Sequence, residues 1–228
     1  MTETPAGAVF GAAPTVGVPE LADWLRRFAA LVAAAKDELT ALDAAIGDAD
    51  HGVNLDRGLQ AVVARLPELG APGATPASLL KGVALTLIST VGGASGPLYG
   101  TFFLRLAGSL GDAPAVGPGE LAAGLRAGLD GMAERGRTQL DDKTMVDALA
   151  PAIAALAAGL PAAWDEALAR SVAAGAAGRD RVTPLVARKG RASYLGERSA
   201  GHQDPGATSA VLLLEALRDA LAPAGAPG

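Results

Sequence analysis

The apolar side chains of this chain recur at intervals of three and four residues along eight separate stretches, the spacing of one face of an α-helix. No stretch shows the two-residue alternation of a strand convincingly, and the abundance of alanine favours helix over sheet. We therefore expect an all-α fold, an antiparallel up-and-down bundle or barrel of eight helices. The expected helices are 19–45, 53–69, 76–89, 97–108, 119–135, 144–160, 161–178 and 205–220.

The length of 228 residues predicts one folded domain. Residues 1–15 are rich in glycine, alanine and proline and lack periodicity, so we expect a disordered N-terminal segment. The same composition predicts a flexible tail at 222–228. The domain is expected to span 16–221.

The composition excludes several classes of protein. No cysteine is present, which excludes disulfides, thiolate metal sites and cysteine nucleophiles. The net charge of −5 disfavours a nucleic-acid binder, which would carry a basic face. No apolar run approaches the roughly 18 residues of a transmembrane helix, and no basic region precedes an apolar core as in a secretory signal. We expect a soluble, cytoplasmic protein without a membrane or nucleic-acid partner.

Four connections between the expected helices are rich in glycine and in polar side chains. In an up-and-down bundle alternate connections lie at the same end, and these four follow the first, third, fifth and seventh helices. We therefore expect them to form one site at one end of the molecule. They are GDADHGVN (47–54), STVGGASGP (89–97), GRTQLDDKTM (136–145) and KGRASYLGERSAGHQDPGATS (189–209).

Three carboxylates, Asp43, Asp48 and Asp50, lie at or just after the end of the first expected helix. Carboxylates at this density repel one another unless a cation lies between them, and oxygen ligands suit Mg²⁺ or Ca²⁺. The spacing does not match an EF-hand loop. The alternative is that Asp48 and Asp50 are only turn and cap residues.

Small residues in 89–97 lead directly into a helix expected to start at Pro97. Such a loop lets backbone N–H groups approach an anion at a helix N-terminus, which is typical of phosphate binding. The segment is not a Walker A loop. The alternative is a tight turn in which the glycines permit two helices to pack closely.

The last two loops carry side chains that would complete such a site. Met145 offers a soft surface for a purine ring, although a core position is the more common role for such a side chain. Arg191 and Arg198 are suited to phosphate oxygens, and Asp204 to the N-cap of the last helix.

His51 and His202, the only two histidines, leave a zinc site as an alternative. The many carboxylates and the absence of thiols favour Mg²⁺. Together the loops predict a site for a Mg²⁺-bound diphosphate or triphosphate.

Segments 41–58, 89–103, 142–151 and 189–209 closely resemble the L subunits of bacterial dihydroxyacetone kinases. These are the ADP-binding subunits of the phosphoenolpyruvate-dependent enzyme. The four segments occur in the family's order and span about 18–221. One departure is Asp141, which stands where the family usually has glycine before the Asp-Lys-Thr motif.

The resemblance implies an eight-helix barrel with Mg-ADP or Mg-ATP at one end, and a catalytic role for Arg191. It implies that Asp43, Asp48 and Asp50 ligate two Mg²⁺ ions. The nucleotide contacts that it implies are His51, Gly52, Val53, Asn54, Ala94, Ser95, Gly136, Met145, Arg191, Asp204, Pro205 and Gly206.

The resemblance also implies partners. In this family a K subunit holds dihydroxyacetone covalently on a histidine, and an M subunit of the phosphotransferase system donates the phosphoryl group from a phosphohistidine. ADP stays bound and is converted to ATP in place. A homodimer is left open.

Two other functions fit the same motifs. One is the nucleotide-binding half of an ATP-dependent ketose or sugar kinase, and the other is a non-catalytic nucleotide-sensing module that regulates a partner. The four polar loops disfavour a purely structural helical protein.

Overall fold

The computed structural model describes residues 14–160 and 163–221. Residues 1–13 of the predicted disordered segment and the predicted tail 222–228 lie outside the described residues. Residues 14–15 are described and belong to no helix or strand. The described residues form nine α-helices, one 3₁₀ helix and two short strands. These are β1 (Val16–Gly17), α1 (Val18–Ala34), α2 (Lys36–Ile46), α3 (His51–Leu69), α4 (Pro76–Thr90), α5 (Ser95–Ser109), β2 (Ala115–Val116), α6 (Pro118–Gly136), α7 (Met145–Gly159), α8 (Trp164–Val182), η1 (Arg191–Ser199) and α9 (Pro205–Leu221).

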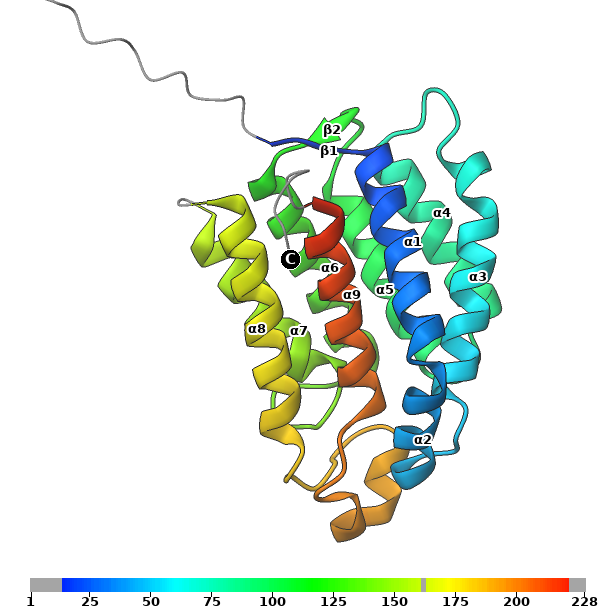
Figure 1. The fold of residues 1–228 in the computed structure, drawn as a ribbon, viewed down its shortest axis with the longest axis vertical. Coiled ribbons are helices and arrows are strands. Elements are labelled where there is room, and N and C mark those ends of the chain that lie inside the picture. The colour runs from blue at the N-terminus through cyan, green and yellow to red at the C-terminus, as the bar shows by residue number, and fades with distance from the viewer. Residues whose placement is uncertain (1–13, 161–162, 222–228) are drawn as a thin grey trace, which may run out of the picture.

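The helices form a closed ring in chain order. α3 packs against α4, α4 against α5, and so on to α8 and α9, and α9 packs back against α1. Figure 1 shows the ring edge-on, with the red α9 beside the blue α1. The predicted all-α up-and-down bundle is confirmed, with α1 and α2 together standing for the first expected helix.

The helix expected over 19–45 is in fact two helices that meet at Ala35. Ala35 has φ −92° and ψ 7°, so it ends α1 and begins α2. α1 buries its apolar face in the main core, and α2 adds Leu39 to it. Ile46 at the end of α2 instead packs with Ala187 and Ala192 in a second, smaller cluster. The break lets the end of α2 pack against the loop end of the bundle while Leu39 stays in the core.

Other boundaries also differ from the sequence pattern. α3 begins at His51 and α5 at Ser95, each two residues before the expected start. The expected start of the seventh helix, Pro161, lies outside the described residues, and α8 begins at Trp164. The expectation of no strand is wrong only for β1 and β2, an antiparallel pair too short to show alternation.

One main hydrophobic core fills the ring, and five of its buried side chains are aromatic: Trp24, Phe28, Tyr99, Phe102 and Phe103. Trp24 and Phe103 have ring centroids 5.5 Å apart, and Phe28 and Tyr99 have centroids 5.8 Å apart. The indole N–H of Trp24 donates to the carbonyl of Leu213 in α9 at 2.9 Å, which satisfies the buried donor and ties α1 to α9.

The loops that follow α2, α4, α6 and α8 lie at one end of the ring, as predicted from their alternation. η1, which the sequence pattern did not indicate, lies in the last of these loops beside α2 (Figure 1). Among the described residues, no helix has the combination of length and apolar character needed to span a bilayer.

Candidate functional site

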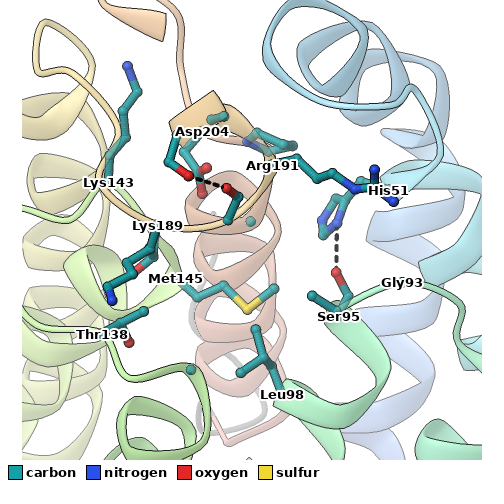
Figure 2. Close-up of a pocket in the computed structure, with 18 of the residues that line it drawn as sticks. His51, Gly93, Ser95, Leu98, Thr138, Lys143, Met145, Lys189, Arg191 and Asp204 are labelled. Atoms are coloured by element: carbon teal, nitrogen blue, oxygen red, sulfur yellow. Dashed lines mark hydrogen bonds between the residues drawn. The ribbon is translucent and has the colours of Figure 1, made fainter. Parts of the chain in front are cut away.

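A cavity of about 920 Å³ opens between the four loops at this end of the ring. Figure 2 shows side chains from all four loops around it, among them His51, Ser95, Met145 and Arg191. The prediction that alternate connections form a single site is therefore confirmed at the level of geometry.

Asp43, Asp48 and Asp50 lie together on one wall of the cavity. Each offers a carboxylate oxygen, and these oxygens lie within 4.8 Å of one another. The buried Asp43 is held in place because its Oδ2 accepts the backbone N–H groups of Asp50 at 2.7 Å and His51 at 3.1 Å. Three converging carboxylate oxygens form a donor set that suits a hard cation such as Mg²⁺.

The glycine-rich loop leads into the N-terminus of α5 on a second wall, beside the carboxylates: a Cβ on Gly93 would lie 3.9 Å from Oδ1 of Asp50. Gly93 has φ 65°, a left-handed conformation that glycine adopts without strain. Ala94 is the N-cap of α5 and makes no side-chain cap bond, so the first N–H groups of the helix have no partner from a capping side chain. A helix N-terminus of this kind is suited to an anion, and the anion site at Ala94 and Ser95 stays a prediction.

His51 links these two walls through a buried chain of hydrogen bonds. Its Nδ1 lies 3.0 Å from Oγ of Ser95 (Figure 2), and its Nε2 lies 3.0 Å from Oγ of Ser209, which is in turn 2.7 Å from the hydroxyl of Tyr99. Burial lowers the pKa of His51 to about 4, although Asp43 acts in the opposite sense. The imidazole is therefore neutral near pH 7, and it fixes the Ser95 hydroxyl at the start of α5.

Only His51 of the predicted contact run 51–54 lines the cavity. Gly52 packs against α2 so closely that a Cβ would lie 2.2 Å from the carbonyl oxygen of Lys36. Asn54 lies beside Gly92 of the glycine loop and accepts a hydrogen bond from Arg57 at 2.8 Å. Val53 is half exposed on the outer side of α3.

Arg191, at the start of η1, reaches across to the acidic wall. Its Nη2 lies 2.8 Å from Oδ2 of Asp48. Arg188 and Lys189 also line the cavity, whereas Arg198 and His202 do not. The structure thus brings one of the two predicted phosphate-binding arginines to the site.

The remaining wall is more apolar and comes from α5, α6, α7 and α9. Met145, Gly136, Pro205 and Gly206, all predicted site residues, line it. The sequence analysis did not single out Leu98, Met132 and Thr138, which line it too. Met132 lies one helical turn before Gly136, a spacing that could have indicated it.

Asp204, the residue before α9, also lines the cavity. Its Oδ2 accepts the N–H of Ala207 at 2.7 Å, so it has the predicted capping role. Burial raises the pKa of Asp204 to about 7, against the lowering effects of the Ala207 hydrogen bond and of Lys143.

Asp141, the residue that departs from the family pattern, has φ 70°. Left-handed backbone explains why glycine is usual there. Arg181 forms an ion pair with Asp141, and the backbone N–H of Asp141 donates to Oδ1 of the buried Asp147 at 2.6 Å. The loop keeps its shape through these two contacts.

The chain is similar to bacterial kinase subunits over almost its whole length. It is 42% identical to the PEP-dependent dihydroxyacetone kinase, ADP-binding subunit DhaL, of Escherichia coli, over 87% of this chain and 94% of that one. It is 39% identical to the ADP-binding subunit DhaL of the PTS-dependent dihydroxyacetone kinase of Lactococcus lactis, over 88% and 96%.

Larger proteins contain a similar part. Human triokinase/FMN cyclase is 34% identical over 86% of this chain, which amounts to 34% of the human protein. The solved dihydroxyacetone kinase of C. freundii in its native form superposes with a TM-score of 0.70 at 26% identity, over 96% of this chain and 37% of that one. Residues 45–219 match the family described as the DAK2 domain. The chain belongs to the DAK2 domain family.

Proposed function

We propose that this chain is the ADP-binding subunit of a phosphoenolpyruvate-dependent dihydroxyacetone kinase. The main observation behind this proposal is that three carboxylates, a glycine-rich helix start and an arginine all line one cavity. The similarity to the DhaL subunits supports it, because the alignments cover nearly the whole of both chains. The chain is then one component of a phosphotransferase made of several proteins.

Asp43, Asp48 and Asp50 would hold Mg²⁺ in this site. The donor set fits the ion, since it consists of closely grouped carboxylate oxygens. The family resemblance supports two ions rather than one. Bound Mg²⁺ supplies the positive charge that phosphate oxygens need, which matters because the chain itself is acidic.

The nucleotide would lie between the acidic wall and the apolar wall. Ala94 and Ser95 at the start of α5 would bind phosphate oxygens, and the neutral His51 would keep the Ser95 hydroxyl in place. Met145 and Leu98 offer an apolar surface to the base. The other proposed contacts are Gly136, Asp204, Pro205 and Gly206, which line the cavity. The contacts predicted at Gly52, Val53 and Asn54 stay predictions, because these three residues do not line it.

Arg191 is the proposed catalytic residue. In the structure its guanidinium is largely exposed and pairs with Asp48. Exposed ion pairs contribute only about 0–1 kcal/mol, so Arg191 can exchange Asp48 for a phosphoryl oxygen at little cost. A guanidinium at that position stabilises the charge that develops during phosphoryl transfer.

The phosphoryl acceptor and donor would be held by partner proteins. Phosphoryl transfer depends mainly on positioning and charge neutralisation, so a site can be complete for the nucleotide while the acceptor arrives on another protein. We propose a K subunit that holds dihydroxyacetone and a phosphohistidine-bearing M subunit that docks at the loop end of the ring. ADP then acts as a resident cofactor, and a homodimer remains a further proposal.

An ATP-dependent ketose kinase is the second candidate. The chain is 33% identical to the L-erythrulose kinase of Pectobacterium atrosepticum, but that alignment covers only 32% of the kinase. The near-complete coverage of the bacterial subunits favours the phosphoenolpyruvate-dependent route.

A radiolabelled-ADP chase during turnover separates the two candidates. The purified chain is mixed with a K subunit, a phosphohistidine donor and dihydroxyacetone, and labelled ADP is then followed against excess free ADP. Retention of the label through many turnovers is the expected result. Rapid exchange of the label together with sustained turnover on ATP would establish the ATP-dependent kinase. Nucleotide binding without phosphoryl transfer in any mixture would instead establish the non-catalytic nucleotide-sensing module.

A further inference from the structure

Lys143 is a buried lysine in the loop between α6 and α7. Its side chain is 1% exposed, and its backbone has φ 64°, a left-handed conformation that residues with a Cβ rarely adopt. Its ammonium donates to three main-chain carbonyls: to Thr183 at 2.8 Å, to Leu185 at 3.0 Å and to Ser199 at 2.7 Å. An ammonium has three donors, so all of them are used.

The three carbonyls mark the two ends of the segment 183–199. Thr183 and Leu185 follow the end of α8, and Ser199 is the last residue of η1. Arg191 lies between these ends and faces the acidic wall. Lys143 lines the cavity, but in Figure 2 its ammonium points away from Met145 and Arg191. The three hydrogen bonds direct its charge at the segment's backbone.

Other hydrogen bonds also hold this segment, among them one from the N–H of Arg188 to the carbonyl of Asp142 at 3.1 Å. The N–H of Ala187 donates to Oγ of Ser199 at 2.9 Å, and Gly201 gives the Thr183 carbonyl a second donor at 2.9 Å. A neutral side chain at position 143 would leave the carbonyls of Leu185 and Ser199 without the ammonium that holds them. Buried acceptors without a partner are costly, so the segment would be expected to open.

We propose that Lys143 is a positioning residue for Arg191, because its ammonium joins both ends of the segment that carries this arginine. The role of Arg191 in phosphoryl transfer rests on the function proposed above. The joining of the two ends of 183–199 by Lys143 does not rest on that function, and it can be measured without any partner protein.

The first test is hydrogen–deuterium exchange of the protein alone. Lys143→Met keeps a long apolar side chain and removes the charge, and we expect faster exchange of the amides in 183–199 with the helical circular dichroism retained. Lys81→Met, on the exposed surface of α4, is the matched control and should exchange as the original protein does. Unchanged protection of 183–199 in Lys143→Met overturns the proposal.

The absence of native cysteine allows a rescue experiment. Lys143→Cys, alkylated with 2-bromoethylamine under denaturing conditions and refolded, regains an ammonium at nearly the original position. The modified protein should regain protection and activity, whereas the unmodified variant should not. Lys143→Met and unmodified Lys143→Cys could both fail to fold. Refolding of the aminoethylated protein with 183–199 protected would then still support the role of the ammonium. A refolded aminoethylated protein in which 183–199 exchanges freely would overturn the proposal.

The second readout separates positioning from general structure. With the K subunit and phosphohistidine donor present, Lys143→Met should lower the transfer rate by about 100-fold, the loss expected from a misplacement of about 1 Å. Mg-ADP affinity should change by no more than about fivefold, the range that loss of the exposed Arg191–Asp48 pair allows, because the carboxylates themselves and the start of α5 are unchanged. In an Arg191→Ala background the same substitution should cause no further loss, since the two residues act in series.

An additive loss in that background, or a full transfer rate in Lys143→Met, overturns the positioning role. A different result would contradict the proposed function alone. In that case the original protein transfers no phosphoryl group, while protection of 183–199 still depends on Lys143.

Discussion

Arg191 and Asp48 form an ion pair across the mouth of the cavity, with 2.8 Å between Nη2 and Oδ2. The arginine lies at the start of η1, and the aspartate lies in the turn after α2. The pair therefore joins the proposed catalytic residue to a proposed metal ligand. Both side chains are partly exposed, at 66% and 36%, so water screens the attraction between them.

Arg191→Ala is expected to separate metal binding from phosphoryl transfer. Loss of the arginine removes a competing cation from Asp48, so Mg²⁺ affinity without nucleotide should be unchanged or rise by up to about fivefold, the range that an exposed pair allows. Transfer to the partner-held acceptor should fall strongly. Calorimetric titration with Mg²⁺ and a reconstituted rate assay measure the two effects, and weaker Mg²⁺ binding would contradict the assignment.

Asp48→Asn and Asp50→Asn should each abolish Mg-ADP binding while the helical fold is retained, because each removes a negative ligand without changing the side chain's shape. In the original protein Mg-ADP at 100 times its Kd should add about 2.7 kcal/mol to the free energy of unfolding. That corresponds to several degrees in Tm. ADP with EDTA is the control, and an equal shift there argues against a metal-bridged site.

Asp204→Asn tests the raised pKa at the start of α9. Because the pKa of Asp204 rises from an ordinary 3.8 to about 7, its folded form binds a proton that the unfolded form releases. Its contribution to stability is therefore full below about pH 4 and is lost as the pH rises through about 7. Asparagine keeps the cap, so the variant should gain stability relative to the original protein across that range.

Urea unfolding of both proteins between pH 4 and 9, without Mg²⁺ or nucleotide, measures this difference. Lys143, Asp147 and Asp43 are the charged groups that act on Asp204, and they are present in both proteins. The lowered pKa of His51, which has the opposite effect at acid pH, is also common to both and cancels. A difference that does not change with pH counts against the raised pKa.

Substitutions at Asp141 test its left-handed backbone. Asp141→Gly loses an exposed ion pair with Arg181 but relieves the backbone, so its stability should stay within about 1 kcal/mol of the original. Asp141→Ala loses the pair and keeps the strain, and it should be about 1–2 kcal/mol less stable than the glycine variant. Equal urea midpoints for the two variants would show that the conformation carries no cost.

The sequence indicated those site residues that are close together along the chain. Asp43, Asp48 and Asp50 fall within one helix end and its turn, so their density indicated a cation site, with turn and cap roles as the alternative, and their oxygens do converge. Lys143 gave no such signal. A lysine in a polar loop is expected to be exposed, and its burial depends on carbonyls in a segment about 40 residues further along the chain.

The sequence by itself determined the helices and the end at which the loops meet. Apolar spacing and helix propensity are local properties, and the alternation of connections then puts four polar loops at one end of an up-and-down ring. Only the tertiary structure decided the break at Ala35, the 3₁₀ helix that carries Arg191 and the third wall of the cavity with Leu98, Met132 and Thr138. These features depend on which surfaces of distant segments pack together, because burial and hydrogen-bond partners arise only when the ring closes.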